Sequence, residues 1–501
     1  MVARSSINSL LLRVFLKLLP VTPLFIQVLY WGWLLSLFAL ADPDSSFLTG
    51  SGRQIILEPL QALYRDQFSW TLSIYGSGPF VKYQWLSEVI FASVHAWGGP
   101  LLQVILVGVL ALLAFLFLPF QYVCESNRTY LKLVSLFIGA LALNGSFFHI
   151  YLRPELFTLV LLSFLFSFDL ASLKRQRLAY LLAFLLFVLS ANLHAGFVLG
   201  LLYLLLLTLH ALFFERQKLK TRAVLLLCST LGCLVNPYGF SLFAYLPKLF
   251  FAKVNQYIVE LLPLTMRDLF TSEYLPFFWL TVLTALIIVV SLFLSQPRQR
   301  LWQNLPLLIF ASALTFGAFL HRRMVVFACL ALLYAALAAL NSPILNSPYS
   351  GRQSKLERVL LLAGCLFCLV FGASFSAATF KLVLPMATIG FQPPFQALEL
   401  IAKERPAGNL LNDPQYGDVM IEKLGTKAQV FIDTRFDAYP YGLIRDFHTM
   451  AAGKEGWASL IDKYKIDWVF LNEDYPLVKL IKTRGFIEIY HGQGACILVR
   501  K

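Results

Sequence analysis

The sequence predicts a polytopic α-helical membrane protein over residues 1–385, followed by a small α/β domain over residues 386–501. Three observations lead to this fold class. Of the 501 residues, 58% are hydrophobic and 14% are charged, whereas soluble domains carry about 25% charged residues. Apolar runs of about 20 residues, the length that spans a bilayer, recur along the first part of the chain. After them, short β-rich segments alternate with helical ones.

The apolar runs define the expected helices. The first run covers roughly residues 18–41. Because it exceeds the roughly 7–15 apolar residues of a signal peptide, we expect it to be an uncleaved transmembrane helix. Further runs begin near residues 100, 131, 156, 178, 196, 223, 274, 304, 324 and 358. Together they predict about eleven membrane spans.

The distribution of basic residues predicts the orientation. The net charge of +14 would favour a nucleic acid partner in a soluble protein. Here the basic residues gather in alternate junctions, at 128–132, 174–177, 216–222, 298–300 and 352–358. Such loops face the cytoplasm. We therefore expect a cytoplasmic N-terminus, an extracytoplasmic C-terminal domain, membrane lipids as the surroundings and no nucleic acid partner.

Three longer segments fall on the expected outer side: residues 42–88 (the first outer segment), residues 236–274 (the second outer segment) and the tail. The composition of the second outer segment fits a helix lying along the membrane interface. In the tail, strands are expected at 409–411, 429–433, 468–471, 487–490 and 496–499, and helices at 416–424, 443–451, 457–464 and 476–482. Strands alternating with helices predict a small α/β sheet.

Ionisable residues gather at the outer ends of the expected helices, where they are costly and therefore indicate function. They are Asp42, Asp44, Arg153, Glu155, His194, Arg322 and Arg323. An acidic pair can supply a general base, and arginines match phosphate oxygens bidentately. This combination is the equipment for transferring a group from a lipid phosphate donor. A divalent cation shared by the two aspartates and the donor phosphate is a further possibility.

Each of these features has a simpler interpretation. The sequence Asp42-Pro43-Asp44 is an ordinary helix stop signal. The turn at residues 153–155 fits a local ion pair at the membrane interface. A single histidine such as His194 is more often a satisfied polar residue than a ligand, and the arginines at 322–323 can extend to lipid headgroups. The cluster as a whole is more specific than its members.

The order of short motifs is similar to that of a known family. They are Asp66-Gln67-Phe68-Ser69, Gln84-Trp85-Leu86-Ser87-Glu88, Arg153-Pro154-Glu155, Asn192-Leu193-His194-Ala195-Gly196, Asn236-Pro237-Tyr238-Gly239, His321-Arg322-Arg323 and, in the tail, Phe431-Ile432-Asp433-Thr434-Arg435. The chain resembles bacterial inner-membrane proteins of the GT-C glycosyltransferase superfamily, which includes protein O-mannosyltransferases, aminoarabinose transferases and oligosaccharyltransferases. It departs from them at Ser45-Ser46, where a Trp-His element is common, and at Gln84, where glutamate is usual.

The resemblance implies an inverting glycosyltransferase that uses a polyprenyl-phosphate sugar at the outer face of the cytoplasmic membrane. It implies a GT-C-like fold for the membrane part. By the same resemblance the catalytic acids are Asp44, Asp42 and Glu155. The residues implied to bind the donor phosphate are Arg322, Arg323 and Arg153, and further candidates are His194, Asp66 and Glu88. The sugar and the acceptor stay open.

Two other classes of function are kept beside this one. A transporter or flippase of a lipid-linked or small polar substrate would place ionisable residues near the bilayer midplane and often shows two related halves. Here the polar residues gather at one face, and we find no internal repeat. A non-catalytic envelope-assembly protein would use the tail to recruit a partner, and deletion of the tail would distinguish this role from catalysis.

Overall fold

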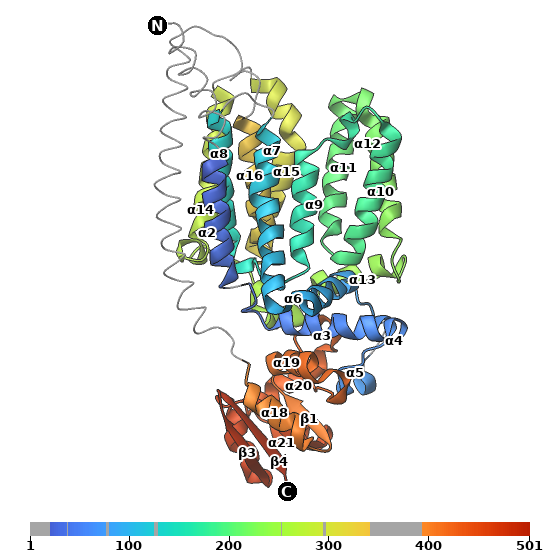
Figure 1. Ribbon diagram of the computed structural model, residues 1–501, viewed down its shortest axis with the longest axis vertical. Helices are drawn as coiled ribbons and strands as arrows, with labels where there is room; N and C mark the ends of the chain where they lie inside the picture. The colour runs from blue at the N-terminus through green and yellow to red at the C-terminus, as the bar shows by residue number, and fades with distance from the viewer. Residues whose placement is uncertain are drawn as a thin grey trace.

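The computed structural model describes residues 21–37, 39–76, 80–124, 129–251, 253–293, 297–340 and 393–501. Figure 1 shows a bundle of long helices with the C-terminal domain at one end. The predicted fold class, a polytopic helical protein with a C-terminal α/β domain, is confirmed. The predicted domain boundary near residue 385, the span expected near residue 358 and the N-terminal twenty residues lie outside the described part of the chain.

Every predicted span that begins before residue 340 coincides with a helix. The bundle is formed by α2 (Val21–Ser36), α6 (Trp85–Leu112), α7 (Leu118–Cys124), α8 (Thr129–Ser146), α9 (Glu155–Ser167), α10 (Gln176–Leu193), α11 (Phe197–Phe214), α12 (Arg216–Cys233), α14 (Leu275–Phe293), α15 (Pro297–Leu320) and α16 (Met324–Leu340). Helix α6 is kinked at Gly98 and Gly99, where Gly99 has φ +62°. The apolar run expected near residue 100 therefore starts at the kink.

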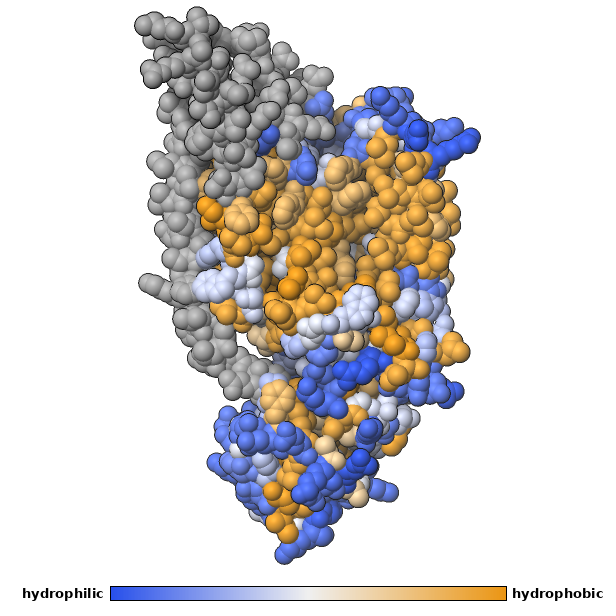
Figure 2. All heavy atoms as spheres, viewed as in Figure 1, coloured by the Kyte–Doolittle hydropathy of each residue, from blue (hydrophilic) through white to orange (hydrophobic). Residues whose placement is uncertain are grey.

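Hydropathy around the bundle fits a membrane environment. Six of the described helices are long and apolar enough to cross a bilayer, and α2, α9 and α16 are shorter apolar helices. On the face that Figure 2 shows, the described bundle helices form an apolar band with hydrophilic residues at its two ends. On α10, Leu178, Leu181, Leu185 and Leu189 are each about half exposed at helical spacing, as expected for a lipid-facing stripe. Helix α16 is instead buried along almost its whole length, which makes it the central helix.

The outer segments lie between the bundle and the C-terminal domain (Figure 1). The first outer segment folds into α3 (Asp44–Leu57), α4 (Pro59–Tyr64) and α5 (Trp70–Tyr75) before α6 begins. The second outer segment contains α13 (Ser241–Phe251), a helix in the stretch where one was predicted, followed by short 3-10 turns. The sequence indicated only a polar stretch over residues 42–88, and its three helices were not predicted.

The C-terminal domain contains α18 (Phe395–Glu404), β1 (Asn409–Asn412), α19 (Pro414–Leu424), α20 (Tyr441–Ala451), α21 (Trp457–Lys463), β2 (Ile466–Asn472), α22 (Pro476–Leu480), β3 (Phe486–Gly492) and β4 (Ala495–Arg500). The sheet order is β1-β2-β4-β3, with β1 and β2 parallel and the other pairs antiparallel. The prediction of a strand at 429–433 is wrong. Val430 forms only an isolated bridge to Ser69 of the first outer segment, and this stretch joins none of the strands of the described sheet.

This bridge is part of a continuous interface between the two domains. The Val430 amide donates to the Phe68 carbonyl at 2.8 Å, and the Trp70 amide donates to the Val430 carbonyl at 3.2 Å. The Trp70 side chain enters the core of the C-terminal domain and its indole donates to the Leu410 carbonyl at 3.1 Å. The first outer segment is therefore built into the C-terminal domain as well as into the bundle.

Helix α3 is held between two close neighbours. A Cβ on Gly50 would lie 2.8 Å from the Glu422 backbone of α19, and a Cβ on Gly52 would lie 1.9 Å from the Glu88 carbonyl of α6. Only glycine permits such an approach on both sides. The helix that begins at Asp44 is thus fixed against both the bundle and the C-terminal domain.

Candidate active site

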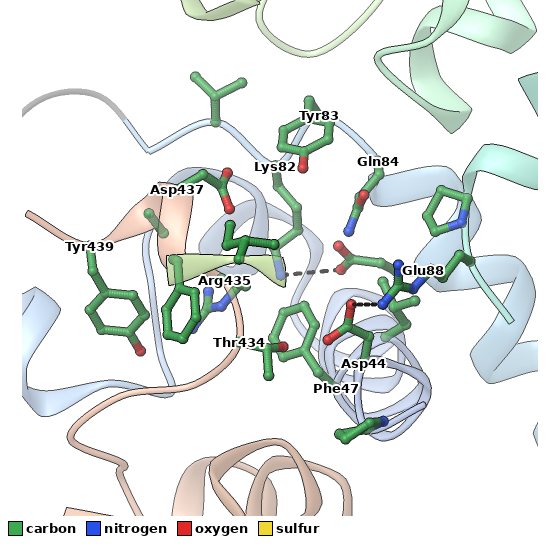
Figure 3. A pocket seen from close by; sticks show the side chains of 18 of the residues that line it. Asp44, Phe47, Lys82, Tyr83, Gln84, Glu88, Thr434, Arg435, Asp437 and Tyr439 are labelled. Carbon is green, nitrogen blue, oxygen red and sulfur yellow. Dashed lines mark ion pairs between the residues drawn. The ribbon is translucent and has the colours of Figure 1, made fainter. Parts of the chain in front are cut away.

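A cavity of about 600 Å³ lies where the end of the bundle meets the C-terminal domain. Its lining comes from the loop after α2, both outer segments, the junctions of the bundle helices and the C-terminal domain (Figure 3). The sequence-predicted residues that line it are Asp42, Asp44, Asp66, Glu88, Arg153, Glu155, His194 and Arg323. Positions far apart in the sequence are therefore brought to one place.

Arg153 lies at the centre of the acidic side of this cavity. Its guanidinium contacts the Asp42 carboxylate, the Asp44 Oδ2 at 3.1 Å and the Glu260 Oε2 at 2.5 Å. The preceding residue, Leu152, donates its amide to the Ala39 carbonyl at 2.9 Å. This bond joins the turn before α9 to the loop after α2. Arg153 consequently holds three carboxylates in position.

Arg323 is the second arginine of the cluster. Its Nη2 lies 3.0 Å from the Glu260 Oε2, and its Nε lies 3.4 Å from the Glu155 Oε2. Its amide donates to the Glu260 carbonyl at 2.8 Å, so backbone pairing with the second outer segment fixes this turn. The Arg323 side chain is 34% exposed, whereas that of Arg153 is 9% exposed. Arg323 is therefore the arginine that a ligand can reach.

Four carboxylates share these two arginines, and their charges do not balance. Burial and the neighbouring Asp44 raise the pKa of Asp42 to about 7, although Arg153 opposes the shift. Burial also acts on Glu260, but Arg153 and Arg323 outweigh it and hold the pKa of Glu260 below its usual range. Burial also raises the pKa of Glu155, although Arg323 and Arg153 oppose the shift. The excess negative charge is therefore relieved at Asp42 and Glu155 rather than at Glu260.

Lys82 is a cation in the cavity that the sequence reasoning missed. It is 6% exposed, lies 3.4 Å from the Glu88 Oε2 and contacts Ser51. The rings of Phe47, Phe68 and Phe80 surround its Nζ at 5.6–5.9 Å. Burial lowers the pKa of Lys82, and Glu88 partly opposes this. The signal in the sequence is a lone lysine between Phe80-Val81 and Tyr83 in the first outer segment.

Arg435 was quoted in a motif of the tail but not proposed as a site residue. It contacts Asp66 of the first outer segment at 2.5 Å and Asp433 at 2.6 Å, and its guanidinium lies 4.7 Å from the Phe47 ring centroid. These carboxylates engage its Nε, Nη1 and Nη2. Arg435 therefore serves as a link between the domains at the cavity wall, with its charge shared by two buried carboxylates.

Two further predicted residues, His194 and Arg322, are held by neighbouring groups. His194 lines the cavity, but its Nδ1 accepts a hydrogen bond from the Gly196 amide at 3.1 Å. Burial and the nearby Arg323 lower its pKa to about 3, so the imidazole is neutral. Arg322 does not line the cavity. It pairs with Asp268 at 3.0 Å and packs against the Tyr274 ring.

The acidic pair does not fit a divalent cation well. The guanidinium of Arg153 contacts both Asp42 and Asp44, in the place where a shared metal ion would have to lie. Among the described residues no group of three histidine, cysteine or acidic side chains is arranged to hold a metal. The arginine thus supplies the positive charge at this point of the site.

Comparison with known proteins identifies the fold. No family model and no curated protein matches the sequence. Two crystal structures of ArnT from Cupriavidus metallidurans do match the model. The structure bound to undecaprenyl phosphate aligns with a TM-score of 0.55 at 12% identity, and the apo structure with a TM-score of 0.56 at 13% identity. Each alignment covers 95% of this chain and 97% of the ArnT chain. The chain has the ArnT fold.

The ArnT fold agrees with the architecture that the sequence predicted, a bundle of membrane helices followed by a C-terminal domain. The match extends over both the bundle and the C-terminal domain, since it covers nearly the whole of each chain. Together with the six described helices that are long and apolar enough to cross a bilayer, it supports a multi-pass membrane protein. At 12–13% identity, the ArnT fold leaves the roles of individual residues to be argued from this chain.

Proposed function

We propose that this protein is an inverting glycosyltransferase that moves a sugar from a polyprenyl-phosphate donor to an acceptor hydroxyl. The observation that carries the proposal is a carboxylate, Asp44, facing the same cavity as a buried cation, Lys82 (Figure 3). A base and a phosphate-binding cation at one end of a membrane bundle suit a reaction in which a lipid phosphate leaves. That ArnT, which shares the fold, binds undecaprenyl phosphate supports this donor class.

The proposed transfer reaction follows from the charged side chains that line the cavity. Asp44 removes the proton of the acceptor hydroxyl, whose oxygen forms a bond to the anomeric carbon. The bond between that carbon and the phosphate oxygen breaks, and the lipid phosphate leaves with the electron pair. Lys82 and Arg323 stabilise the leaving phosphate electrostatically, so no general acid is required. Attack opposite to the leaving group inverts the anomeric carbon.

Asp44 suits the role of base better than Asp42 does. The Asp44 side chain is 30% exposed, whereas that of Asp42 is 9% exposed and lies against Arg153. Asp44 is also the first residue of α3, which Gly50 and Gly52 fix in place. We infer that Asp42 acts through Arg153 and so positions the cluster around Asp44.

The expected orientation is part of the proposal. The described basic junctions at 174–177 and 216–222 lie at the end of the bundle opposite the C-terminal domain (Figure 1). Under the positive-inside rule this end faces the cytoplasm. The cavity and the C-terminal domain then lie on the outer face of a bacterial inner membrane. Access of an impermeant thiol reagent to single cysteines introduced at exposed Lys403 and Lys220 tests the orientation.

Replacement of Lys82 tests the donor site. Lys82→Met keeps the length and the apolar contacts of the stem but removes the charge. We expect the Kd for undecaprenyl phosphate to rise about tenfold or more, since a hydrogen bond to a charged group contributes about 1.5–3 kcal/mol. Binding to purified protein in lipid nanodiscs measures this. The matched control is exposed Lys403→Met, and equal binding by both variants would contradict the assignment.

The raised pKa of Asp42 predicts a pH dependence. Below about pH 7 Asp42 is protonated, so Arg153 interacts more strongly with Asp44 and makes it a weaker base. Above this pH the Asp42 carboxylate holds Arg153, and the rate of transfer rises. We expect kcat/KM to show an acid limb near this pH in the wild type. Asp42→Asn should give a low rate without that limb, and an unchanged limb in this variant would contradict the expected role of Asp42.

A further inference from the structure

One wall of the cavity carries no part of the mechanism above. It consists of Tyr83 from the first outer segment, Tyr245 from α13 and Asp437 from the C-terminal domain. Three segments distant in the sequence thus place two phenol rings and a carboxyl group beside one another. In Figure 3, Asp437 and Tyr83 lie on one side of the Lys82 ammonium group and Asp44 lies on the other.

The contacts within this wall are specific. The Tyr245 hydroxyl donates to Asp437 Oδ2 at 3.2 Å. The centroids of the Tyr83 and Tyr245 rings are 6.1 Å apart, with 34° between their planes. Tyr245 is buried at 8% exposure, while Tyr83 and Asp437 are half-buried and face the cavity. The two rings and the carboxyl group therefore form a surface with both apolar and hydrogen-bonding character.

The charge of this wall differs from that of the rest of the cavity. Among the described residues, Asp437 forms no ion pair, because the neighbouring Arg435 is engaged by Asp66 and Asp433. Burial raises the pKa of Asp437, although the Tyr245 hydroxyl and Arg435 oppose the shift. This wall offers two phenol rings and an acidic side chain but no cation of its own, so it does not suit the anionic part of a donor.

The wall formed by Tyr83, Tyr245 and Asp437 does suit the neutral part of the donor, which is its sugar. A carboxylate accepts hydrogen bonds through two oxygens, and phenol rings present an apolar face with a polar hydroxyl at the end. Hydroxyl-rich rings offer apolar C–H faces and several O–H donors. Tyr83 directly follows Lys82 in the chain. Because Lys82 and the three residues of this wall line one cavity, a sugar joined to a phosphate at Lys82 lies within reach of the wall.

We propose that Tyr83, Tyr245 and Asp437 form the subsite that binds the hydroxyl groups of the donor sugar. This inference rests on the proposed function, because it takes the donor phosphate to lie at Lys82. It assigns the choice of sugar jointly to the membrane part and the C-terminal domain. The C-terminal domain then contributes directly to substrate binding, through Asp437.

The test compares a lipid phosphate with and without a sugar. Full-length protein in nanodiscs is titrated with undecaprenyl phosphate and with undecaprenyl-phosphate-linked pentoses and hexoses. We expect at least one linked sugar to bind the wild type about tenfold more tightly than the bare lipid phosphate. Asp437→Asn should remove this difference while the Kd for undecaprenyl phosphate stays the same. Tyr245→Phe, which retains the ring, should reduce the difference, and exposed Asp462→Asn is the matched control.

The outcomes separate the inference from the function on which it rests. If the wild type binds undecaprenyl phosphate but gains nothing from any attached sugar, the subsite is overturned and the donor site stands. The same holds if both Asp437→Asn and Tyr245→Phe discriminate as the wild type does. If undecaprenyl phosphate does not bind, or if Lys82→Met binds it equally well, the proposed function itself fails. Thermal unfolding of each variant shows whether a lost affinity reflects lost structure.

Discussion

Asp44→Asn is expected to lower the rate of sugar transfer about a thousandfold, within the 10²–10⁴-fold range of general base catalysis. The substitution keeps the size of the side chain and its place at the start of α3, but it removes the group that accepts the proton. Because the donor phosphate binds at Lys82 and Arg323 in the proposed mechanism, the Kd for undecaprenyl phosphate should change little. Transfer of a radiolabelled sugar in proteoliposomes measures the rate.

The comparison with Asp42 sharpens this experiment. Asp42→Asn should lower the rate of sugar transfer less than Asp44→Asn does, since Asp42 is proposed to act through Arg153 and not on the acceptor. The double variant should be no slower than the single Asp44→Asn variant within error, because the base is already absent. Exposed Asp474→Asn serves as the control. A wild-type rate of sugar transfer by the Asp44→Asn variant would contradict the proposed mechanism.

Arg435→Met is expected to release the C-terminal domain from the bundle. The substitution leaves Asp433 and Asp66 buried, at 0% and 7% side-chain exposure, without their cation. Loss of one partner from a buried ion pair costs about 3–5 kcal/mol. Asp66 also accepts the Ser69 amide at 2.7 Å, so the segment that pairs with Val430 should loosen. Hydrogen exchange at residues 66–71 and 430–435 is the measurement, with transfer activity as a second readout.

Two further variants make this result specific. Arg445→Met changes an arginine of the same domain that is 63% exposed and lies 3.5 Å from Asp446, and it should have no effect on exchange or activity. Asp66→Asn should destabilise the interface less in the Arg435→Met background than in the wild type, and this difference measures the coupling between the two residues. Additive effects in this cycle would show that the link between Asp66 and Arg435 does not join the domains.

The sequence predicted the bundle well because the forces that define it are local. A span of about 20 apolar residues is required by the thickness of the bilayer, and each expected start before residue 340 falls on a helix. The gathering of ionisable residues on one side of the bundle could also be predicted, because each of those residues follows or precedes an apolar run. Most of the predicted site residues therefore line one cavity.

The tail shows where local pattern was insufficient. Residues 429–433 have the composition of a strand, but Val430 pairs with Ser69 of the first outer segment. Side-chain periodicity indicates that a stretch can be extended, whereas its hydrogen-bonding partner depends on which backbone lies beside it. The helices of residues 42–88 escaped prediction for a related reason. Helix α3 buries Gly50, Gly52 and several hydroxyl side chains beside its apolar residues, so no continuous apolar run marks it in the sequence.

By itself the sequence determined that this chain spans a membrane, roughly where its apolar spans lie before residue 340, and that its ionisable residues gather at one end. Only the tertiary structure decided which charges remain available there. It neutralised Arg153 with three carboxylates, directed Arg322 away to Asp268, and brought Lys82, Glu260 and Asp437 into the cavity. Hydropathy acts residue by residue along the chain, whereas the reactivity of a charged group depends on its neighbours in space and on their burial.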